Sequence, residues 1–255
     1  MDYGLRDKVA IVTGGSIGLG ASITDKLLEE GAKVCFTYHR DTEELRNRVQ
    51  SLKDQYGDRI DALSIDVSID EDIERLFDHT LEVFGQVDLI VNNAGVWPTS
   101  YIKDMTAESF RRTLDINLIA PFLLCKRFIN YCIDNGRKGK VVNMVSQAAF
   151  YGSTSGHAHY ASSKAGLVGF TISLAREVAK YGINVNAVAP GIMETKLVSA
   201  IVDDPVRREK YLERIPIGHI ATPEEVARIV LFLLGKESDY MTGATLDATG
   251  GMLMR

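Results

Sequence analysis

Short apolar runs alternate along this chain with longer segments in which apolar residues recur at helical spacing. The runs are rich in β-branched residues and are bounded by glycine, proline or polar residues, so each is predicted to be a strand. The predicted strands cover residues 8–13, 34–38, 62–65, 87–91, 140–145, 184–189 and 244–248. Helices are predicted between them, including residues 161–180 and a largely helical stretch that extends from Thr106 to about Ile133.

Capping residues indicate where several helices begin. Asp41 is predicted to be an N-cap, with Glu44 three residues later, and Ser68 with Glu71 has the spacing of a capping box. The stretch Thr222–Glu225 combines a threonine cap, a proline in the first turn and a glutamate at the third position.

Strand–helix units of roughly 30 residues predict a parallel sheet with helices on both faces. No linker or repeat interrupts the pattern, so residues 1–255 are predicted to form a single doubly wound, Rossmann-type α/β domain with seven parallel strands. The carboxyl ends of parallel strands meet along one edge, where such folds bind ligands. Unusual residues follow the first six strands: Gly14, His39, Arg40, Asp66, Asn93, Gly95, Ser146, Pro190 and Gly191.

Composition removes several classes of function. A net charge of -5 argues against a nucleic-acid-binding protein. The longest apolar run near the C-terminus, residues 229–234, is too short to cross a membrane, and no secretory leader is visible. The cysteines Cys35, Cys125 and Cys132 lack metal-ligand spacing, so we expect reduced thiols in a cytoplasmic protein and no metal site.

A glycine-rich turn, Gly14 to Gly20, follows the first predicted strand and opens a helix. Glycines allow the backbone to approach a pyrophosphate, and a helix N-terminus offers N–H groups to it. The turn therefore indicates a dinucleotide site, with a simple tight turn as the alternative.

The second predicted strand ends at His39 and Arg40, with no carboxylate before Asp41. A carboxylate at this point would hold the ribose hydroxyls of NAD, whereas a cation can meet the 2′-phosphate of NADP. The sequence thus favours NADP(H), with NAD(H) possible. The alternative is that Arg40 is a solvated loop charge.

Tyr160 and Lys164 lie four residues apart in a predicted helix, on one face. A nearby ammonium is expected to lower the pKa of a phenol from about 10. The pair would then serve as an acid and base for interconverting a carbonyl and an alcohol. The alternative is a packed ring beside a solvated amine.

Six features of the sequence carry a resemblance when they are taken together: T-G-G-S-I-G-L-G, N-N-A-G, I-N-L, Ser146, Y-A-S-S-K and P-G-I-M-E-T. On these features the sequence resembles the short-chain dehydrogenase/reductase superfamily over essentially the whole chain. The C-terminal part resembles its 3-oxoacyl-carrier-protein reductase and glucose dehydrogenase branches.

This resemblance implies a catalytic set. Tyr160 would be the general acid or base, and Lys164 would lower its pKa and hold the nicotinamide ribose. Ser146 would polarise the carbonyl, and Asn117 would hold a water that relays protons. The alternatives are a helix kink at Asn117, a strand end at Ser146 and a surface charge at Lys164.

The resemblance also implies cofactor and substrate contacts. The cofactor would contact Gly14, Ser16, Ile17, Gly18, Leu19, His39, Arg40, Asp66, Val67, Asn93, Ala94, Gly95, Tyr160, Lys164, Pro190, Gly191, Met193 and Thr195. The substrate would contact Trp97, Ser146, Gln147, Tyr151, His157 and Tyr160, under a mobile lid at about residues 192–213.

Two features depart from the family pattern. Ile17 stands where NADP-preferring relatives often have arginine, which leaves Ser16, His39 and Arg40 to meet a 2′-phosphate. The segment between Ser146 and Tyr160 is one residue longer than usual, with the extra residue in 153–159, beside the substrate pocket.

The activity implied is reduction of a ketone to a secondary alcohol, with a 3-oxoacyl thioester as the leading substrate. Oxidation of a sugar, polyol or hydroxysteroid is the alternative, and a non-catalytic cofactor-sensing protein is the alternative from another class. An acyl-carrier protein is a candidate partner, and it would bind a basic patch formed by Arg127, Arg137, Lys138 and Lys140. The alternative is that these four residues form a solvated face without a partner. Relatives imply a homotetramer paired through the helices at 106–133 and 160–181.

Overall fold

The computed structural model describes residues 2–153, 155–195 and 203–255. Within these residues a seven-stranded parallel sheet has the order β3-β2-β1-β4-β5-β6-β7, which confirms the predicted fold. Its strands are β1 (Val9–Val12), β2 (Lys33–Tyr38), β3 (Ile60–Ser64), β4 (Leu89–Asn92), β5 (Gly139–Met144), β6 (Ile183–Pro190) and β7 (Thr245–Ala248). The strand order reverses direction between β1 and β4, and folds of this kind bind ligands at that point.

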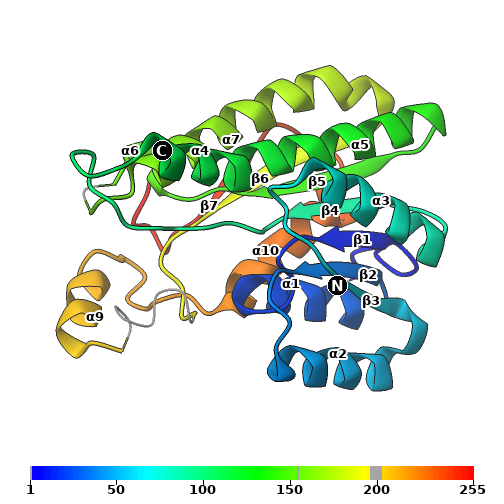
Figure 1. Cartoon of the computed structure of the whole chain (residues 1–255), viewed down its shortest axis with the longest axis horizontal. Coiled ribbons are helices and arrows are strands. Elements are labelled where there is room, and N and C mark those ends of the chain that lie inside the picture. Colours follow the sequence, from blue (N-terminus) through cyan, green and yellow to red (C-terminus); the bar gives the residue numbers. More distant parts are fainter. Residues whose placement is uncertain (1, 154, 196–202) are drawn as a thin grey trace.

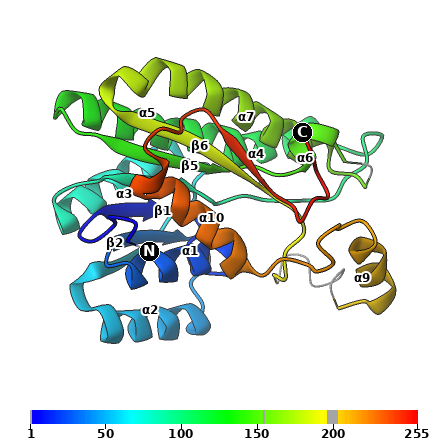
Figure 2. The same ribbon diagram turned by 180° about the vertical axis from the view of Figure 1, so that it is seen from behind.

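Helices cover both faces of the sheet (Figures 1 and 2). One face carries α1 (Gly18–Glu29), α2 (Glu43–Tyr56) and α10 (Pro223–Leu234); the other carries α3 (Asp70–Phe84), α4 (Ala107–Leu114), α5 (Ala120–Asp134) and α7 (Ala158–Val178). Short 3-10 turns occur at Gly57–Arg59, Ala179–Tyr181 and Lys236–Ser238. Side chains of β1 alternate between the two apolar cores, with Ala10 and Val12 facing one and Ile11 the other.

The α4–α5 stretch, Ala107–Asp134, is 28 residues long and apolar enough to pass a length-and-composition test for a membrane span. Half of its most apolar window is buried inside the protein, where α5 packs against α3 and the sheet. A long, largely buried helix is what the core of a globular domain contains, so this is weak evidence for a span.

Two of the three predicted helix caps were wrong. The N-cap of α2 is Thr42, whose side chain accepts from Leu45 N, because the Asp41 carboxylate is held by Arg46. Helix α3 begins at Asp70 without a side-chain cap, because the Ser68 hydroxyl donates to Asp66 instead. The Thr222–Glu225 capping box is confirmed.

Two elements lie next to the predicted site and were missed or misplaced. Helix α7 begins at Ala158, three residues earlier than expected, so Tyr160 stands in its first turn. A four-residue helix, α6 (Ala148–Tyr151), follows Ser146 directly and is too short to show a helical period.

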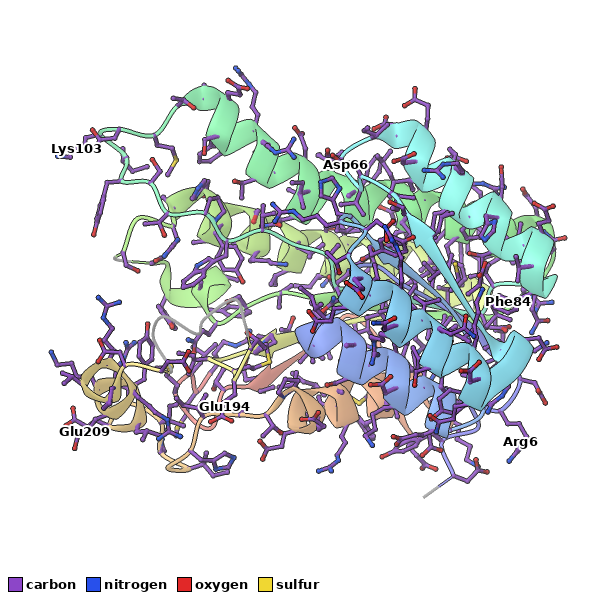
Figure 3. The ribbon with its side chains drawn as sticks, turned by 60° about the horizontal axis from the view of Figure 1, so that its bottom comes forward. Arg6, Asp66, Phe84, Lys103, Glu194 and Glu209 are labelled. Carbon is purple, nitrogen blue, oxygen red and sulfur yellow. The ribbon has the colours of Figure 1, made fainter. Side chains whose placement is uncertain are left out.

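Helix α9 (Pro205–Leu212) stands apart from the sheet, at the same end of the molecule as α6 in both views (Figures 1 and 2). It belongs to the predicted lid, about residues 192–213, of which 196–202 lie outside the described residues. Figure 3 shows Glu194 and Glu209 on the two described parts of this segment.

Candidate active site

The glycine turn between β1 and α1 is held closely against its neighbours. Thr37 at the end of β2 accepts from Gly14 N through its hydroxyl and from Gly15 N through its carbonyl, each at 3.0 Å. A Cβ atom on Gly20 would lie 2.1 Å from the Gly14 carbonyl oxygen, so α1 packs onto the turn as only glycine permits. The backbone of Gly14 is left-handed, with φ of +64°, which a side chain would strain.

The N-terminus of α1 is suited to an anion. Its N-cap residue, Ile17, provides no side-chain cap, and no acidic residue occupies the first turn. Within the described residues no side chain caps the first N–H groups of the helix, which carry the positive end of the helix dipole. These residues fit the pyrophosphate of a dinucleotide.

Asn93 fastens the end of β4 to the glycine turn. Its Nδ2 donates to the carbonyl oxygens of Thr13 (3.0 Å) and Gly14 (3.1 Å). The Thr13 hydroxyl in turn accepts from the backbone N–H of Asn93 and of Ala94. Sequence reasoning missed Thr13; its signal was a polar residue that ends a buried strand.

His39 and Arg40 are exposed at the end of β2. Arg40 forms no ion pair with any residue in the described part of the chain, whereas Asp41 beside it makes a two-pronged pair with Arg46 at 2.9 and 2.8 Å. A cation is thus available here, and the nearest following carboxylate is already neutralised.

Asp66 and Val67 follow β3, as predicted for the residues around an adenine. The pKa of Asp66 is lowered, chiefly because its carboxylate accepts hydrogen bonds from the hydroxyl (2.6 Å) and the N–H (3.0 Å) of Ser68. The ends of β2 and β3 lie side by side, since Tyr38 pairs with Ser64 in the sheet.

Tyr160 is partly buried, and it lies beside Ser146. Burial raises the pKa of the Tyr160 phenol, and the hydrogen bond with Ser146 opposes that shift. The expectation that Lys164 lowers this pKa was wrong for the protein as it stands, because loss of solvent outweighs any effect of the distant ammonium.

Lys164 is 5% exposed, which excludes the reading of a surface charge. Its Nζ atom donates to the Met144 carbonyl oxygen at 2.6 Å and lies 5.9 Å from the centroid of the Tyr160 ring. Burial lowers the pKa of Lys164 to about 8, so this amine can exchange a proton near neutral pH.

Asn117 lies in a π-helical turn, Asp115–Ile119, between α4 and α5. It is fully buried, accepts from Val96 N, and donates to Val96 O and the Ser163 hydroxyl. A Cβ atom on Gly95 would lie 3.2 Å from Asn117 Oδ1 and 3.6 Å from Lys164 Nζ. Asn117 and Lys164 thus approach the same glycine. The π-helical turn therefore coincides with the hydrogen bonds that Asn117 makes to Val96.

Aromatic residues line the next part of the site. Trp97 stacks on His157 with ring centroids 4.3 Å apart and meets Tyr160 edge-on at 6.4 Å. His157 is only 4% exposed, and its Nδ1 bonds the Pro98 carbonyl at 2.8 Å. We therefore revise its predicted role: His157 supports Trp97 more than it offers polar atoms to a substrate.

Helix α6 carries the other predicted substrate residues. Gln147 N donates to Pro190 O, and its side-chain Oε1 is buried with no protein partner in the described residues. Tyr151 is 50% exposed. Burial raises the pKa of Tyr151, and Arg214 and Tyr211 also influence it. Tyr211 belongs to the predicted lid, whereas Arg214 lies just beyond it and was not predicted. The chain segments concerned are far apart in sequence, so no local pattern signals this influence.

The segment after β6 returns to the glycine turn. Gly191 N donates to Ala248 O, and Met193 bridges to Ala221. A Cβ atom on Gly18 would lie 3.6 Å from Thr195 Cγ2. The predicted phosphate and nicotinamide ends of the site therefore meet at this edge of the sheet.

The predicted basic patch is not a free cationic surface. Arg127 pairs with Glu74 and Asp78, Arg137 with Asp88, and Lys140 with Asp239. The patch also lies near the amino end of β5, whereas Ser146 follows the carboxyl end of the same strand. It is therefore badly placed to deliver a carrier-bound substrate.

Comparison with known proteins agrees with this geometry. A family model described as "Enoyl-(Acyl carrier protein) reductase" matches residues 14–253. The 3-oxoacyl-(acyl-carrier-protein) reductase FabG of Vibrio cholerae is 38% identical over 250 residues, covering 98% of this chain and 99% of that protein. The Escherichia coli FabG is 37% identical over 97% of this chain and 98% of its own length. This chain belongs to the short-chain dehydrogenase/reductase superfamily.

Solved structures of short-chain dehydrogenases show the same fold. A crystal structure of a putative gluconate dehydrogenase from Agrobacterium tumefaciens superposes with a TM-score of 0.92 at 30% identity, covering 100% of this chain and 99% of its own. A short-chain dehydrogenase from Bacillus anthracis gives 0.86 at 30% identity, with 98% of both chains covered. As a superfamily member related to the FabG reductases, the chain is an oxidoreductase that uses a nicotinamide cofactor.

Proposed function

We propose that this short-chain dehydrogenase/reductase is an NADP(H)-dependent reductase of 3-oxoacyl thioesters, with Tyr160 as its acid. The observation that carries the proposal is the joint position of Tyr160, Ser146 and Lys164 at one edge of the sheet, in a chain 37–38% identical to FabG reductases over nearly its whole length.

A reduced nicotinamide, when bound, supplies the hydride that a ketone carbon accepts. Ser146 donates a hydrogen bond to the carbonyl oxygen, and Tyr160 transfers its phenolic proton to that oxygen, giving the alcohol. Lys164 replaces the proton that Tyr160 has lost, because its pKa of about 8 lets it both hold and release one at neutral pH. Asn117 fixes the loop that carries Gly95 and Val96 beside Lys164. In the oxidation direction the proton moves back to Tyr160.

The preference for NADP(H) is supported at the end of β2. Arg40 is exposed and unpaired within the described residues, and Asp41 is engaged by Arg46. A 2′-phosphate near Arg40, His39 and Ser16 would gain a charge-assisted contact and would meet little repulsion.

A homotetramer in the cytoplasm remains the expected state. Its predicted pairing surface is supported by apolar exposure on α5 and α7: Phe122 is 41% and Ile172 is 40% exposed, whereas Leu174 belongs to the core. Phe122 and Phe170 meet edge-on at 6.0 Å and join the two helices on this surface. Molar mass from light scattering tests the assembly.

Oxidation of a sugar acid or polyol is the second candidate function. It is favoured by the likeness to the putative gluconate dehydrogenase and by the polar residues beside Ser146, namely Gln147 and Tyr151. A cofactor-sensing protein without chemistry is the third; tight NADPH binding with no turnover of any carbonyl would support it.

The experiment that tests the proposal follows the nicotinamide absorbance in both directions. Purified protein is given acetoacetyl-coenzyme A with NADPH or NADH, and gluconate or glucose with NADP⁺ or NAD⁺. Preferred reduction of the thioester with NADPH supports the proposal. Faster oxidation of gluconate with no thioester reduction would replace it with the second candidate.

A further inference from the structure

Ser146 and the short helix α6 form one hydrogen-bonded unit. The Ser146 hydroxyl oxygen accepts from Ala148 N at 3.2 Å, and the Ser146 carbonyl oxygen accepts from Ala149 N at 3.0 Å. Because a backbone N–H engages the hydroxyl oxygen, the hydroxyl proton is directed to the other side, where it can be donated to a carbonyl oxygen. The direction of the Ser146 hydroxyl therefore depends on where α6 lies.

Helix α6 is only four residues long, so its own hydrogen bonds do little to fix it. At its start, Gln147 N donates to Pro190 O at 3.2 Å. Toward its end, the Phe150 ring packs against a small apolar cluster made of Val145, Leu167, Ala187 and Ala189. Phe150 thus attaches the far end of the helix to the core beside β6.

Arg255 covers the Phe150 ring. Its guanidinium carbon lies 3.7 Å from the ring centroid. The same guanidinium makes a two-pronged ion pair with Asp247 on β7, at 3.0 and 2.8 Å, and donates to Thr245 O at 3.2 Å. The Arg255 side chain is 36% exposed, so most of it is in contact with protein. Arg255 therefore joins α6 to the last strand of the sheet.

The segment after β7 is folded so that it brings Arg255 to this position. The Thr249 hydroxyl accepts from Leu253 N at 3.1 Å, and Met252 N donates to Thr249 O at 3.2 Å. Thr249 itself is 5% exposed, which fixes the start of the turn. The end of the chain consequently lies beside α6 in both views (Figures 1 and 2).

We propose that Arg255 is a positioning residue for the reaction: it clamps Phe150 against the core, and through α6 it holds the Ser146 hydroxyl toward the substrate carbonyl. This inference rests on the proposed role of Ser146 in carbonyl reduction. Arg255 acts through Phe150 and Ala148 and does not itself touch the reacting atoms. An arginine suits this position because its planar guanidinium can stack on a ring and bind a carboxylate with two donors at once.

The test measures reduction of acetoacetyl-coenzyme A with NADPH by Arg255→Gln. Its kcat is expected to fall roughly 3- to 10-fold, the effect of losing one stacked cation, while the affinity for NADPH stays within about twofold. Arg255→Lys should recover part of the loss, because an ammonium also binds an aromatic face but cannot form the two-pronged pair.

Arg59→Gln is the matched control. The Arg59 guanidinium lies over the Tyr56 ring, 5.1 Å from its centroid, and donates to Leu28 O at 2.9 Å. Arg59 belongs to the turn before β3, at the amino end of that strand. Its loss removes a stacked arginine away from α6, and kcat should stay at the wild-type value.

A double variant separates positioning from a general loss of structure. If Arg255 acts through Ser146, then Arg255→Gln should change kcat by less than about twofold when Ser146 is already alanine. The same fold loss in the Ser146→Ala background as in the wild type would overturn the inference while the reductase activity stands. No loss of kcat in Arg255→Gln alone would overturn it equally.

Hydrogen exchange tests the clamp without turnover. The amides of residues 148–152 should exchange at least about tenfold faster in Arg255→Gln than in the wild type or in Arg59→Gln, and those of α7 should not change. If the wild type reduces no thioester, the proposed function fails, and the clamp is judged by this exchange. Unchanged exchange at residues 148–152 would reject it.

Discussion

The Nζ atom of Lys164 lies 5.9 Å from the centroid of the Tyr160 ring, and its short hydrogen bond is to the Met144 carbonyl rather than to the phenol. Both groups are withdrawn from solvent, and burial raises the pKa of the phenol while it lowers that of the amine to about 8. Because the pKa of the phenol starts at 10.0 and rises while that of the amine starts at 10.5 and falls, the two proton affinities move apart, and a proton passes downhill from the Lys164 ammonium to a Tyr160 phenolate. Burial is the cause of both shifts, and Lys164 has no carboxylate partner among the described residues.

Burial of Lys164 makes stability depend on pH. Because its pKa falls from 10.5 to about 8 on folding, the unfolded chain binds more protons between these values, and stability rises with pH in that window. From about pH 7 to about pH 9.5 the free energy of unfolding should therefore rise by roughly 2 kcal/mol more in the wild type than in Lys164→Met. Urea titrations of both proteins at the two pH values check this. If the free energy of unfolding changes equally with pH in the wild type and in Lys164→Met, folding does not lower the pKa of Lys164.

The two glycines Gly20 and Gly169 offer a matched test of the cofactor turn. A methyl group on Gly20 would meet the Gly14 carbonyl at 2.1 Å and Asn93 Nδ2 at 2.5 Å, whereas no atom of the described residues lies within 4 Å of a Cβ on Gly169 in α7. Gly20→Ala should cost about 1–3 kcal/mol of stability and displace the turn, which should weaken NADPH binding at least about tenfold. Gly169→Ala should leave binding unchanged and add up to about 1 kcal/mol of stability.

Fluorescence titration with NADPH and thermal melting measure both effects. Normal NADPH affinity in Gly20→Ala would mean that the cofactor does not depend on the shape of this turn.

Arg40 decides the choice of cofactor in this account. Arg40→Gln should weaken NADPH binding by roughly 10-fold or more, the loss of one charge-assisted hydrogen bond, and should leave NADH binding nearly unchanged. Arg228→Gln, an exposed arginine on α10, is the control for a change of net charge. Equal effects of Arg40→Gln on the two cofactors would remove the argument for NADP(H).

The sequence predicted the sheet well because strands buried on both faces appear as apolar runs, as residues 9–12 and 89–92 do. It misplaced caps because short polar residues compete for several partners: the Ser68 hydroxyl bonds Asp66, and Arg46 takes Asp41. Only the three-dimensional arrangement settles such competition.

Some parts of the site could likewise be predicted from the sequence, and others could not. Gly14 to Gly20, Asn117, Ser146, Tyr160 and Lys164 stand in recognisable motifs, and the structure brings them to one edge of the sheet. The direction of the Tyr160 pKa shift was wrong because it depends on how much protein surrounds the phenol, which no motif encodes. The influence of Arg214 on the pKa of Tyr151 couples α6 to the segment after α9 and has no signal in the sequence.

The measurement that tests the central claim most directly is the turnover of Tyr160→Phe beside that of Tyr181→Phe. Both remove one phenolic hydroxyl, but Tyr181 is 42% exposed at the far end of α7. Tyr160→Phe should lose on the order of 10²–10⁴-fold in kcat while its affinity for NADPH stays near that of the wild type. Tyr181→Phe should keep full activity. A Tyr160→Phe enzyme that binds NADPH and reduces the ketone at the wild-type rate would contradict the assignment of Tyr160 as the proton donor.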